Sequence, residues 1–399
     1  MDSYIILTPE IGNMGGGQMY TNNKVRYLKE HGWNVQVFYF KDGGSIKMPY
    51  LKEYDGNVIP EFRSAFYYVP ISRRNRIAKR IQTNIVGSEA IIIESQLIDL
   101  AFWGEDIAKR IGAKHIVNFI EEQVPVMNDK KLSFFEYKLK KWQMLNAGEQ
   151  SQKRVFKDKW KEEYAAFTNM ISYKCSNVIC DVECDIRFKP CDFSIITIGR
   201  LDKPYVEYMT SEFIVFAEKH KDKKINIIYV GGSPDGIKEK EIPILFQEIK
   251  NATIYMMGYT FPVPLSVVKQ ASVAVASANS ILVTSDLDIP TISLDMNDCK
   301  AIGVYGYNTL NKFLRNENEP ALQLSSVLDD VLIYKKYPRK GIIVDSMKDV
   351  DEEFDREMEF LLKSESQQTY YDLSFLTTPL ERGYSQFKWH IRQIINFIK

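Results

Sequence analysis

The sequence predicts an α/β protein made of two doubly wound domains, each a parallel sheet covered by helices. The chain has 399 residues, more than one compact core usually holds. Short β-branched apolar runs alternate with helical patterns, which is typical of βα units and parallel sheets. The alternation restarts after Cys191. We therefore expect an N-terminal domain at 1–190 and a second domain at 191–378.

Composition excludes several classes of protein. Lys+Arg and Asp+Glu number 52 each, so no net basic charge recruits nucleic acid. The five cysteines lack CxxC spacing, which favours buried thiols over a zinc site. No signal peptide precedes the first strand pattern, and no apolar run has the length of a membrane span. We expect a cytoplasmic protein whose cysteines hold no zinc.

The first βαβ unit contains a glycine-rich loop. A strand at 4–8 leads to this loop, a helix at 19–31 and a second strand at 35–40. Gly15, Gly16 and Gly17 allow close backbone approach at a helix N-terminus, where an anion binds well. The spacing is not G-x-G-x-x-G and no acidic residue ends the second strand, so a dinucleotide-dependent oxidoreductase is disfavoured.

The βα pattern continues with helices at 72–85 and 97–111 and strands at 90–94 and 115–120. Glu94, Glu121 and Glu122 end two of these strands, where a carboxylate can act on an acceptor hydroxyl or bind a sugar, or can simply cap a helix.

The region 130–160 is basic and aromatic, with Phe135, Leu139 and Trp142 on one helical face. It is a candidate for peripheral contact with the inner face of the cell membrane. The more common explanation is a helix packed on the sheet with its lysines in solvent.

In the second half, each strand ends in a glycine, serine or polar turn. Strands are expected at 195–198, 225–230, 252–257, 273–276 and 289–294. Such turns at the carboxyl edge of a sheet form a ligand site. The turn residues singled out are Arg200, Lys203, Gly231, Gly232, Tyr259, Ser277, Asn279 and Ser280.

Arg200 and Lys203 follow the first of these strands and suit phosphate, since one offers a planar donor fork and the other a mobile charge. The alternative is that Arg200 pairs with Asp202 and only solvates a loop.

The tail, 379–399, is predicted to be an amphipathic helix that crosses back to the first domain and buries its apolar stripe there. That stripe comprises Tyr384, Phe387, Ile391, Ile394 and Ile398.

The order and spacing of these motifs resemble the GT-B glycosyltransferases, and within them the retaining group-one, RfaB-like family. The resemblance covers most of the chain and rests on five motifs. They are the glycine loop, Gly-Arg-Leu followed by Lys, a strand ending in Gly-Gly-Ser-Pro, Met-Gly-Tyr, and a serine-rich turn before Ile-Pro. The resemblance implies two Rossmann-like domains facing a cleft. It also implies that a nucleotide-sugar donor binds the second domain, with no metal or other cofactor.

The resemblance also implies roles for individual residues. Gly15 to Gly17 would approach the donor, and Arg200 with Lys203 would neutralise its diphosphate. Tyr259 would meet the base, and Ser277 to Ser280 the phosphate and sugar. Glu121 or Glu122 stands near the place of a histidine that many members carry.

The family's Glu-x7-Glu signature is missing. Counted back from Pro290, its second glutamate falls on Val283, and Asp286 is a candidate for the ribose role instead. The sequence therefore predicts a divergent hexosyltransferase. It would move a sugar, from a UDP-sugar, to a hydroxyl of a glycan or lipid-linked glycan in bacterial surface polysaccharide synthesis. The alternative is an inactive GT-B-like partner or chaperone subunit of an active transferase.

Overall fold

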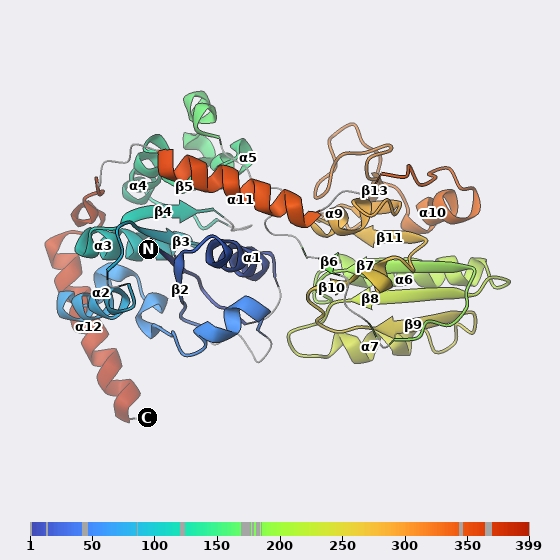
Figure 1. Ribbon diagram of the computed structural model, residues 1–399, viewed down its shortest axis with the longest axis horizontal. Helices are drawn as coiled ribbons and strands as arrows, with labels where there is room; N and C mark the ends of the chain where they lie inside the picture. The colour runs from blue at the N-terminus through green and yellow to red at the C-terminus, as the bar shows by residue number, and fades with distance from the viewer. Residues whose placement is uncertain are drawn as a thin grey trace. The chain divides into compact units, whose positions relative to one another are not determined.

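The computed structural model describes residues 2–12, 15–41, 47–85, 87–119, 124–168, 177, 179–180, 184, 186–342, 346–363 and 369–398. The chain forms two α/β units (Figure 1). Unit 1 comprises Met1–Asn13, Tyr20–Ile171 and Phe354–Lys399, and unit 2 comprises Met14–Met19 and Ser172–Glu353. The chain thus returns to unit 1 at Phe354, within a helix that precedes the predicted tail.

Unit 1 is built on a five-stranded parallel sheet in the order β2-β1-β3-β4-β5. Its strands are β1 Ser3–Leu7, β2 Asn34–Phe38, β3 Ile91–Ser95, β4 Lys114–Asn118 and β5 Met144–Leu145. Its longer helices are α1 Gly16–Glu30, α2 Ile71–Thr83, α3 Ile98–Ile111, α4 Asp129–Lys140, α5 Glu149–Phe156 and α12 Pro379–Ile398. Short 3-10 turns include η3 Phe66–Tyr68, η4 Lys157–Lys159, η5 Glu162–Phe167 and η7 Leu373–Leu376. The predicted βα order of this half is confirmed.

Unit 2 contains a six-stranded sheet in the order β13-β12-β11-β7-β8-β9. Its strands are β7 Phe193–Ile198, β8 Ile225–Val230, β9 Ala252–Met256, β11 Val273–Ala276, β12 Thr291–Leu294 and β13 Ala301–Val304. Its helices include α6 Tyr205–Lys219, α7 Lys238–Leu245, α8 Leu265–Val268, α9 Ser280–Ser285, α10 Leu324–Leu328 and the first part of α11 Ser346–Lys363. A separate parallel pair joins β6 Ile179–Cys180 to β10 Val263–Pro264.

The order of strands in unit 2 creates a switch point at β7. The chain first adds β8 and β9 on one side of β7 and later adds β11 and β12 on the other. The turns that follow β7 and its two neighbours therefore lie together at the carboxyl edge of the sheet, where open α/β sheets bind ligands. The antiparallel edge strand β13 was not predicted, because its short run of small residues lacks a strand pattern.

Region 130–160 packs differently from the membrane alternative. Phe135 and Leu139 of α4 lie in the core of unit 1, so the protein itself covers these two members of the apolar face. The third member, Trp142, follows the helix and is 39% exposed. Lys138, expected on the solvent side, is also fully buried and pairs with Glu105 at 2.5 Å.

The tail confirms one expectation and corrects another. The C-terminal helix packs on unit 1, where α12 contacts η3. The described part of its predicted stripe is not buried, however: Tyr384 and Phe387 are each 62% exposed and Ile391 is 39% exposed. The side chains of Ile394 and Ile398, the other two members, lie outside the described residues. Periodicity shows that a helix has two faces, but not which face meets the protein. Among the described residues, no helix is long and apolar enough to cross a membrane.

Candidate functional site

The turns that follow β7 and β8 are packed against each other through glycine. A Cβ built on Gly231 would lie 1.7 Å from the carbonyl oxygen of Gly199, so no side chain fits there. Backbone hydrogen bonds join the turns: the Gly199 amide donates to Val230 at 2.9 Å and the Leu201 amide to Gly232 at 3.0 Å. We call the turns 199–203, 231–233 and 258–260 the strand-end site.

Tyr259 covers the second of these turns. A Cβ built on Gly232 would lie 2.7 Å from two carbons of the Tyr259 ring, so only glycine lets the ring approach this closely. Burial raises the pKa of Tyr259, and its buried hydroxyl has no hydrogen-bond partner among the described residues. The site therefore has a fixed aromatic ring beside bare backbone.

Arg200 and Lys203 give the strand-end site its positive charge. The Arg200 Nε donates to Asp202 Oδ1 at 2.9 Å, and its Nη2 also pairs with the Asp202 carboxylate. This ion pair holds the pKa of Asp202 below its usual range. The alternative raised from the sequence, a local pair, is thus present in this structure. It keeps the guanidinium at the turn and leaves its charge there half neutralised.

Helix α6 begins beside these cations. The Lys203 carbonyl accepts from the Val206 amide at 3.0 Å, which fixes the turn against the first residues of α6. The N-terminus of a 15-residue helix adds partial positive charge and amide donors directed at this turn. Two cations and a helix N-terminus together suit a diphosphate.

The glycine loop also belongs to this neighbourhood. Residues 14–19 group with unit 2, and a Cβ built on Gly15 would lie 3.8 Å from Nη1 of Arg200. Gly16 and Gly17 are the first residues of α1. The structure therefore places the backbone of Gly15 close to the Arg200 guanidinium.

The serine-rich turn after β11 lies next to the turn after β7. The Ser277 hydroxyl donates to the Leu294 carbonyl at 3.0 Å, so it serves the fold. Ala278 has a φ of 56°, a left-handed conformation that costs a non-glycine residue about 1 kcal/mol or more. Asn279 precedes α9, and Ser280 Oγ lies 3.8 Å from a Cβ built on Gly199. Ser280 is thus the residue of this turn nearest to the strand-end site.

Asp286 lies at the other end of α9 and is almost fully buried. Burial, together with the nearby Asp349 charge, raises the pKa of Asp286 to about 7, and Lys312 opposes this shift. Its Oδ2 atom has no hydrogen-bond partner among the described residues. Lys312, which is half-buried, is the cation that influences Asp286, and nothing in the sequence marks it for this role. Val283, where the family has a glutamate, is part of the core.

The candidate carboxylates of unit 1 have different outcomes. Glu121 and Glu122 lie outside the described residues. Glu94 is fully buried, and its carboxylate accepts from the hydroxyls of Tyr4 at 2.7 Å and Tyr20 at 3.1 Å. Glu94 therefore belongs to the core rather than to a site.

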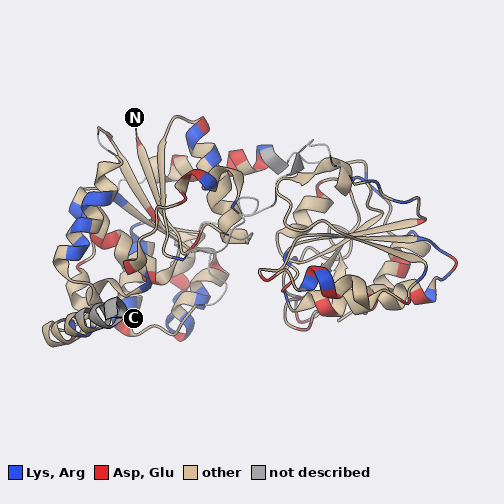
Figure 2. Ribbon diagram, turned by 90° about the horizontal axis from the view of Figure 1, so that it is seen from below, with Lys and Arg blue, Asp and Glu red and all other residues tan. Residues whose placement is uncertain are grey.

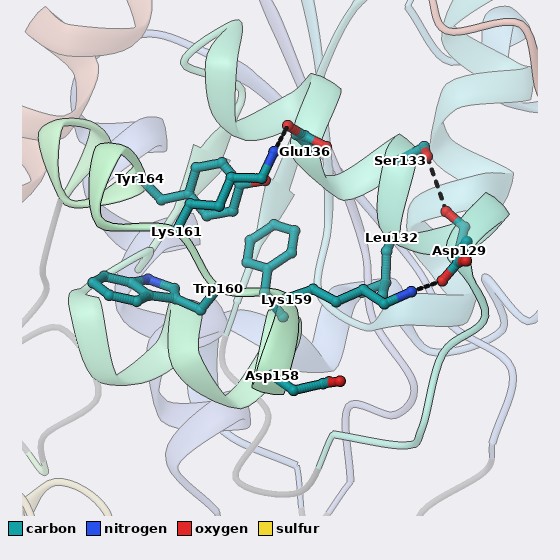
Figure 3. A pocket seen from close by; sticks show the side chains of 10 residues that line it. Asp129, Leu132, Ser133, Glu136, Asp158, Lys159, Trp160, Lys161 and Tyr164 are labelled. Carbon is teal, nitrogen blue, oxygen red and sulfur yellow. Dashed lines mark hydrogen bonds and ion pairs between the residues drawn. The ribbon is translucent and has the colours of Figure 1, made fainter.

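Unit 1 also has a cavity of about 390 Å³ between α4, η4 and η5 (Figure 3). Its polar groups largely pair with one another: Lys159 with Asp129, and Lys161 with Glu136. None of the predicted site residues lines it. The lining residues are Asp129, Leu132, Ser133, Glu136, Phe156, Asp158, Lys159, Trp160, Lys161 and Tyr164. In the part of the chain that the structure describes, no cluster of His, Cys, Asp and Glu could hold a metal ion.

Two α/β units, with a cationic turn and glycine turns at the strand ends of the second, define a GT-B architecture. Solved glycosyltransferases share it. A glycosyltransferase from Rickettsia africae ESF-5 superposes with a TM-score of 0.57 at 14% identity, over 92% of this chain and 99% of that one. HepE from Anabaena, in complex with UDP and glucose, superposes with a TM-score of 0.54 at 10% identity, over 91% of this chain and 100% of that one. No family model and no curated protein matches the sequence.

Proposed function

We propose that this protein is a glycosyltransferase that uses a nucleotide-sugar donor. The observation that supports this most strongly is the strand-end site, where Arg200, Lys203 and the N-terminus of α6 gather positive charge beside the bare backbone of Gly231 and Gly232. A diphosphate fits this combination. The shared fold with HepE, solved with UDP and glucose, supports UDP as the nucleotide.

In finer detail, we propose a retaining, metal-independent hexosyltransferase. The bond between the sugar C1 and the diphosphate breaks, and an acceptor hydroxyl attacks C1 from the face that the diphosphate leaves. The hydroxyl proton passes to the departing phosphate oxygen. Arg200 and Lys203 stabilise the negative charge that develops on the diphosphate, which is the largest contribution that such a site can make. Gly15 would approach the donor, as its position near Arg200 suggests.

The remaining residues have narrower proposed roles. Tyr259 stacks on the base, and Ser280 with Asn279 meets the phosphate or sugar from the turn after β11. Asp286 is proposed for the ribose because its buried Oδ2 lacks a partner among the described residues, while Glu121 or Glu122 would act on the acceptor hydroxyl. The acceptor is proposed to be a glycan or lipid-linked glycan of a bacterial surface polysaccharide, and the site of action is proposed to be the cytoplasm.

The test is UDP release from UDP-glucose and related donors, followed with and without glycan acceptors, together with calorimetry of UDP. Arg200→Ala should reduce turnover by a factor of about 150, since losing such a donor costs ~3 kcal/mol of transition-state stabilisation. Arg187→Ala is the matched control, because Arg187 is an exposed arginine that lies outside the strand-end site. Unchanged turnover in Arg200→Ala would contradict the role of this residue.

A second function, an inactive GT-B-like partner of an active transferase, is favoured by three observations. Neither signature glutamate is present, Val283 is in the core, and Ser277 uses its hydroxyl within the fold. The same calorimetry separates the two proposals: no affinity for any nucleoside diphosphate would favour the partner.

A further inference from the structure

The C-terminal helix α12 is docked with its apolar stripe facing away from the protein. Leu380 is 87% exposed, Tyr384 and Phe387 are 62% exposed and Ile391 is 39% exposed. Their spacing of four, three and four residues places them on one face of the helix. This stripe extends for ~16 Å at 1.5 Å per residue. Scattered apolar residues at a surface are ordinary, but a continuous apolar stripe marks an interaction site.

The opposite face of α12 attaches the helix to unit 1. Arg382, Ser385, Gln386 and Trp389 are half-buried, and Trp389 packs against the core of unit 1. The usual amphipathic arrangement is therefore inverted, because the more polar face meets the protein and the more apolar face meets solvent.

The start of α12 is specified by its sequence. Thr378 and Glu381 form a capping box: the Thr378 amide donates to the Glu381 carboxylate at 2.7 Å, and the Glu381 amide donates to the Thr378 hydroxyl at 3.2 Å. Pro379 occupies the first helical position, where proline is well tolerated. The helix is thus built to begin at this point, beside η3.

Cations are frequent on α12 and on the nearby helix α2. Helix α2 carries five Lys and Arg residues and no carboxylate, and α12 itself carries three cations and one carboxylate. Two of the α2 cations are paired, Arg73 with Glu61 and Arg74 with Asp106, which leaves the exposed ones for a partner. The whole chain, in contrast, has 52 Lys and Arg residues and 52 Asp and Glu residues. The two helices are neighbours, because α12 contacts η3, the turn that directly precedes α2 in the chain. The charge of Arg382 also helps to lower the pKa of Arg74 on α2. Figure 2 shows Lys and Arg segments on unit 1 at the side where the C-terminal helix lies.

We propose that α12 and the exposed cations of α2 form a docking surface for an anionic lipid bilayer. The stripe of Leu380, Tyr384, Phe387 and Ile391 enters the boundary between headgroups and acyl chains. Arg76 and Lys79, both exposed on α2, meet the phosphate charges. Lys388 lies 4.4 Å from the centre of the Tyr384 ring, so its charge stays at headgroup level while its stem covers the stripe. This surface is separate from the apolar face of α4, which the core covers, and does not depend on the proposed function.

The test is flotation of the full chain with vesicles of phosphatidylglycerol and phosphatidylcholine, compared with phosphatidylcholine alone. We expect binding to the anionic vesicles, weakened by salt. Phe387→Glu should reduce partitioning at least tenfold, since it removes an inserted aromatic residue and adds a negative charge. Arg76→Glu with Lys79→Glu should reduce it at least tenfold, at roughly fivefold per cation, and remove the preference for anionic lipid.

Leu310→Glu is the matched control for the first variant, because Leu310 is 77% exposed but belongs to unit 2. It should bind vesicles as the unaltered chain does, and circular dichroism should show all variants folded. The proposal is overturned if the unaltered chain binds neither vesicle, binds both equally, or keeps its binding in Phe387→Glu. A dimer in light scattering that Phe387→Glu converts to a monomer, without vesicle binding, would assign the stripe to a second copy instead.

Discussion

Protonation of one buried histidine should make unit 1 sensitive to mild acid. The Nδ1 of His115 lies 2.7 Å from Glu105 Oε2 and its Nε2 lies 3.0 Å from Ser95 Oγ, with Lys138 bound to the same carboxylate. Glu105 and Lys138 already balance each other, so a proton on His115 would add an unmatched charge to the core. Burial, followed by the Lys138 charge, lowers the pKa of His115 from 6.5 to about 4.

Because the folded state resists protonation and the unfolded state does not, stability is complete above about pH 6.5 and falls as the pH decreases toward 4. Two pH units of this range correspond to ~2.7 kcal/mol at ~1.36 kcal/mol per unit, a large share of the stability of an ordinary domain. The pKa of Glu105 is lowered to about 2, so its own contribution is lost only below pH 4.5. Burial raises the pKa of Glu94, which also lies in unit 1, so His115 is identified by comparing the unaltered chain with a His115 variant between pH 7.5 and 4.5.

Urea unfolding followed by tryptophan fluorescence measures this directly. Five tryptophans occur in the chain, and all of them belong to unit 1. His115→Gln should lower stability at pH 7.5 yet flatten its decline toward pH 4.5. His31→Gln, a change at an exposed histidine, should leave the decline unaltered. If His115→Gln and the unaltered chain lose stability in parallel between pH 6.5 and 4.5, the reasoning is refuted.

Three further substitutions test other parts of the molecule. Gly231→Ala should destabilise unit 2 by at least ~2 kcal/mol in thermal melting, because its Cβ would collide with a backbone oxygen. The control Gly236→Ala should cost less, because the space around Gly236 is open. Asp202→Asn should tighten UDP binding roughly fivefold in calorimetry, because it removes about 1 kcal/mol of repulsion between the Asp202 carboxylate and the diphosphate. Weaker binding of UDP by this variant would contradict the proposed diphosphate site. Lys24→Met should cost ~3–5 kcal/mol in urea unfolding, because it strands the buried Glu357 carboxylate, and adding Glu357→Gln should restore much of that loss.

The parallel strands could be predicted from the sequence because burial on both faces demands continuous apolar runs. The run 225–230, for example, is β8 residue for residue. The strand-end turns could be located too, since Gly-Arg and Gly-Gly interrupt those runs abruptly. The Arg200–Asp202 ion pair could also be predicted, because its two residues are only two positions apart in the sequence.

Other features depend on packing that no local pattern contains. The burial of Lys138 requires Glu105, 33 positions earlier in the chain, and Lys312 reaches Asp286 from a loop beyond β13. The orientation of α12 is of the same kind: its sequence defines two faces, but only the surface of unit 1 decides which one is covered.

The positions of the strand-end turns along the chain affect the order in which the site folds. Its three turns follow β7, β8 and β9, which are consecutive in the chain and adjacent in the sheet, so residues 193–260 contain all of them. These strands pair across 27 and 32 positions, whereas β11 pairs with β7 across 78, so less loop-closure entropy opposes the first three strands. During synthesis this part can assemble before the rest of unit 2 has emerged. The turn after β11 joins only when that strand inserts on the opposite side of β7. We therefore expect the half of unit 2 with the proposed diphosphate site to acquire structure before the half that would contact the sugar.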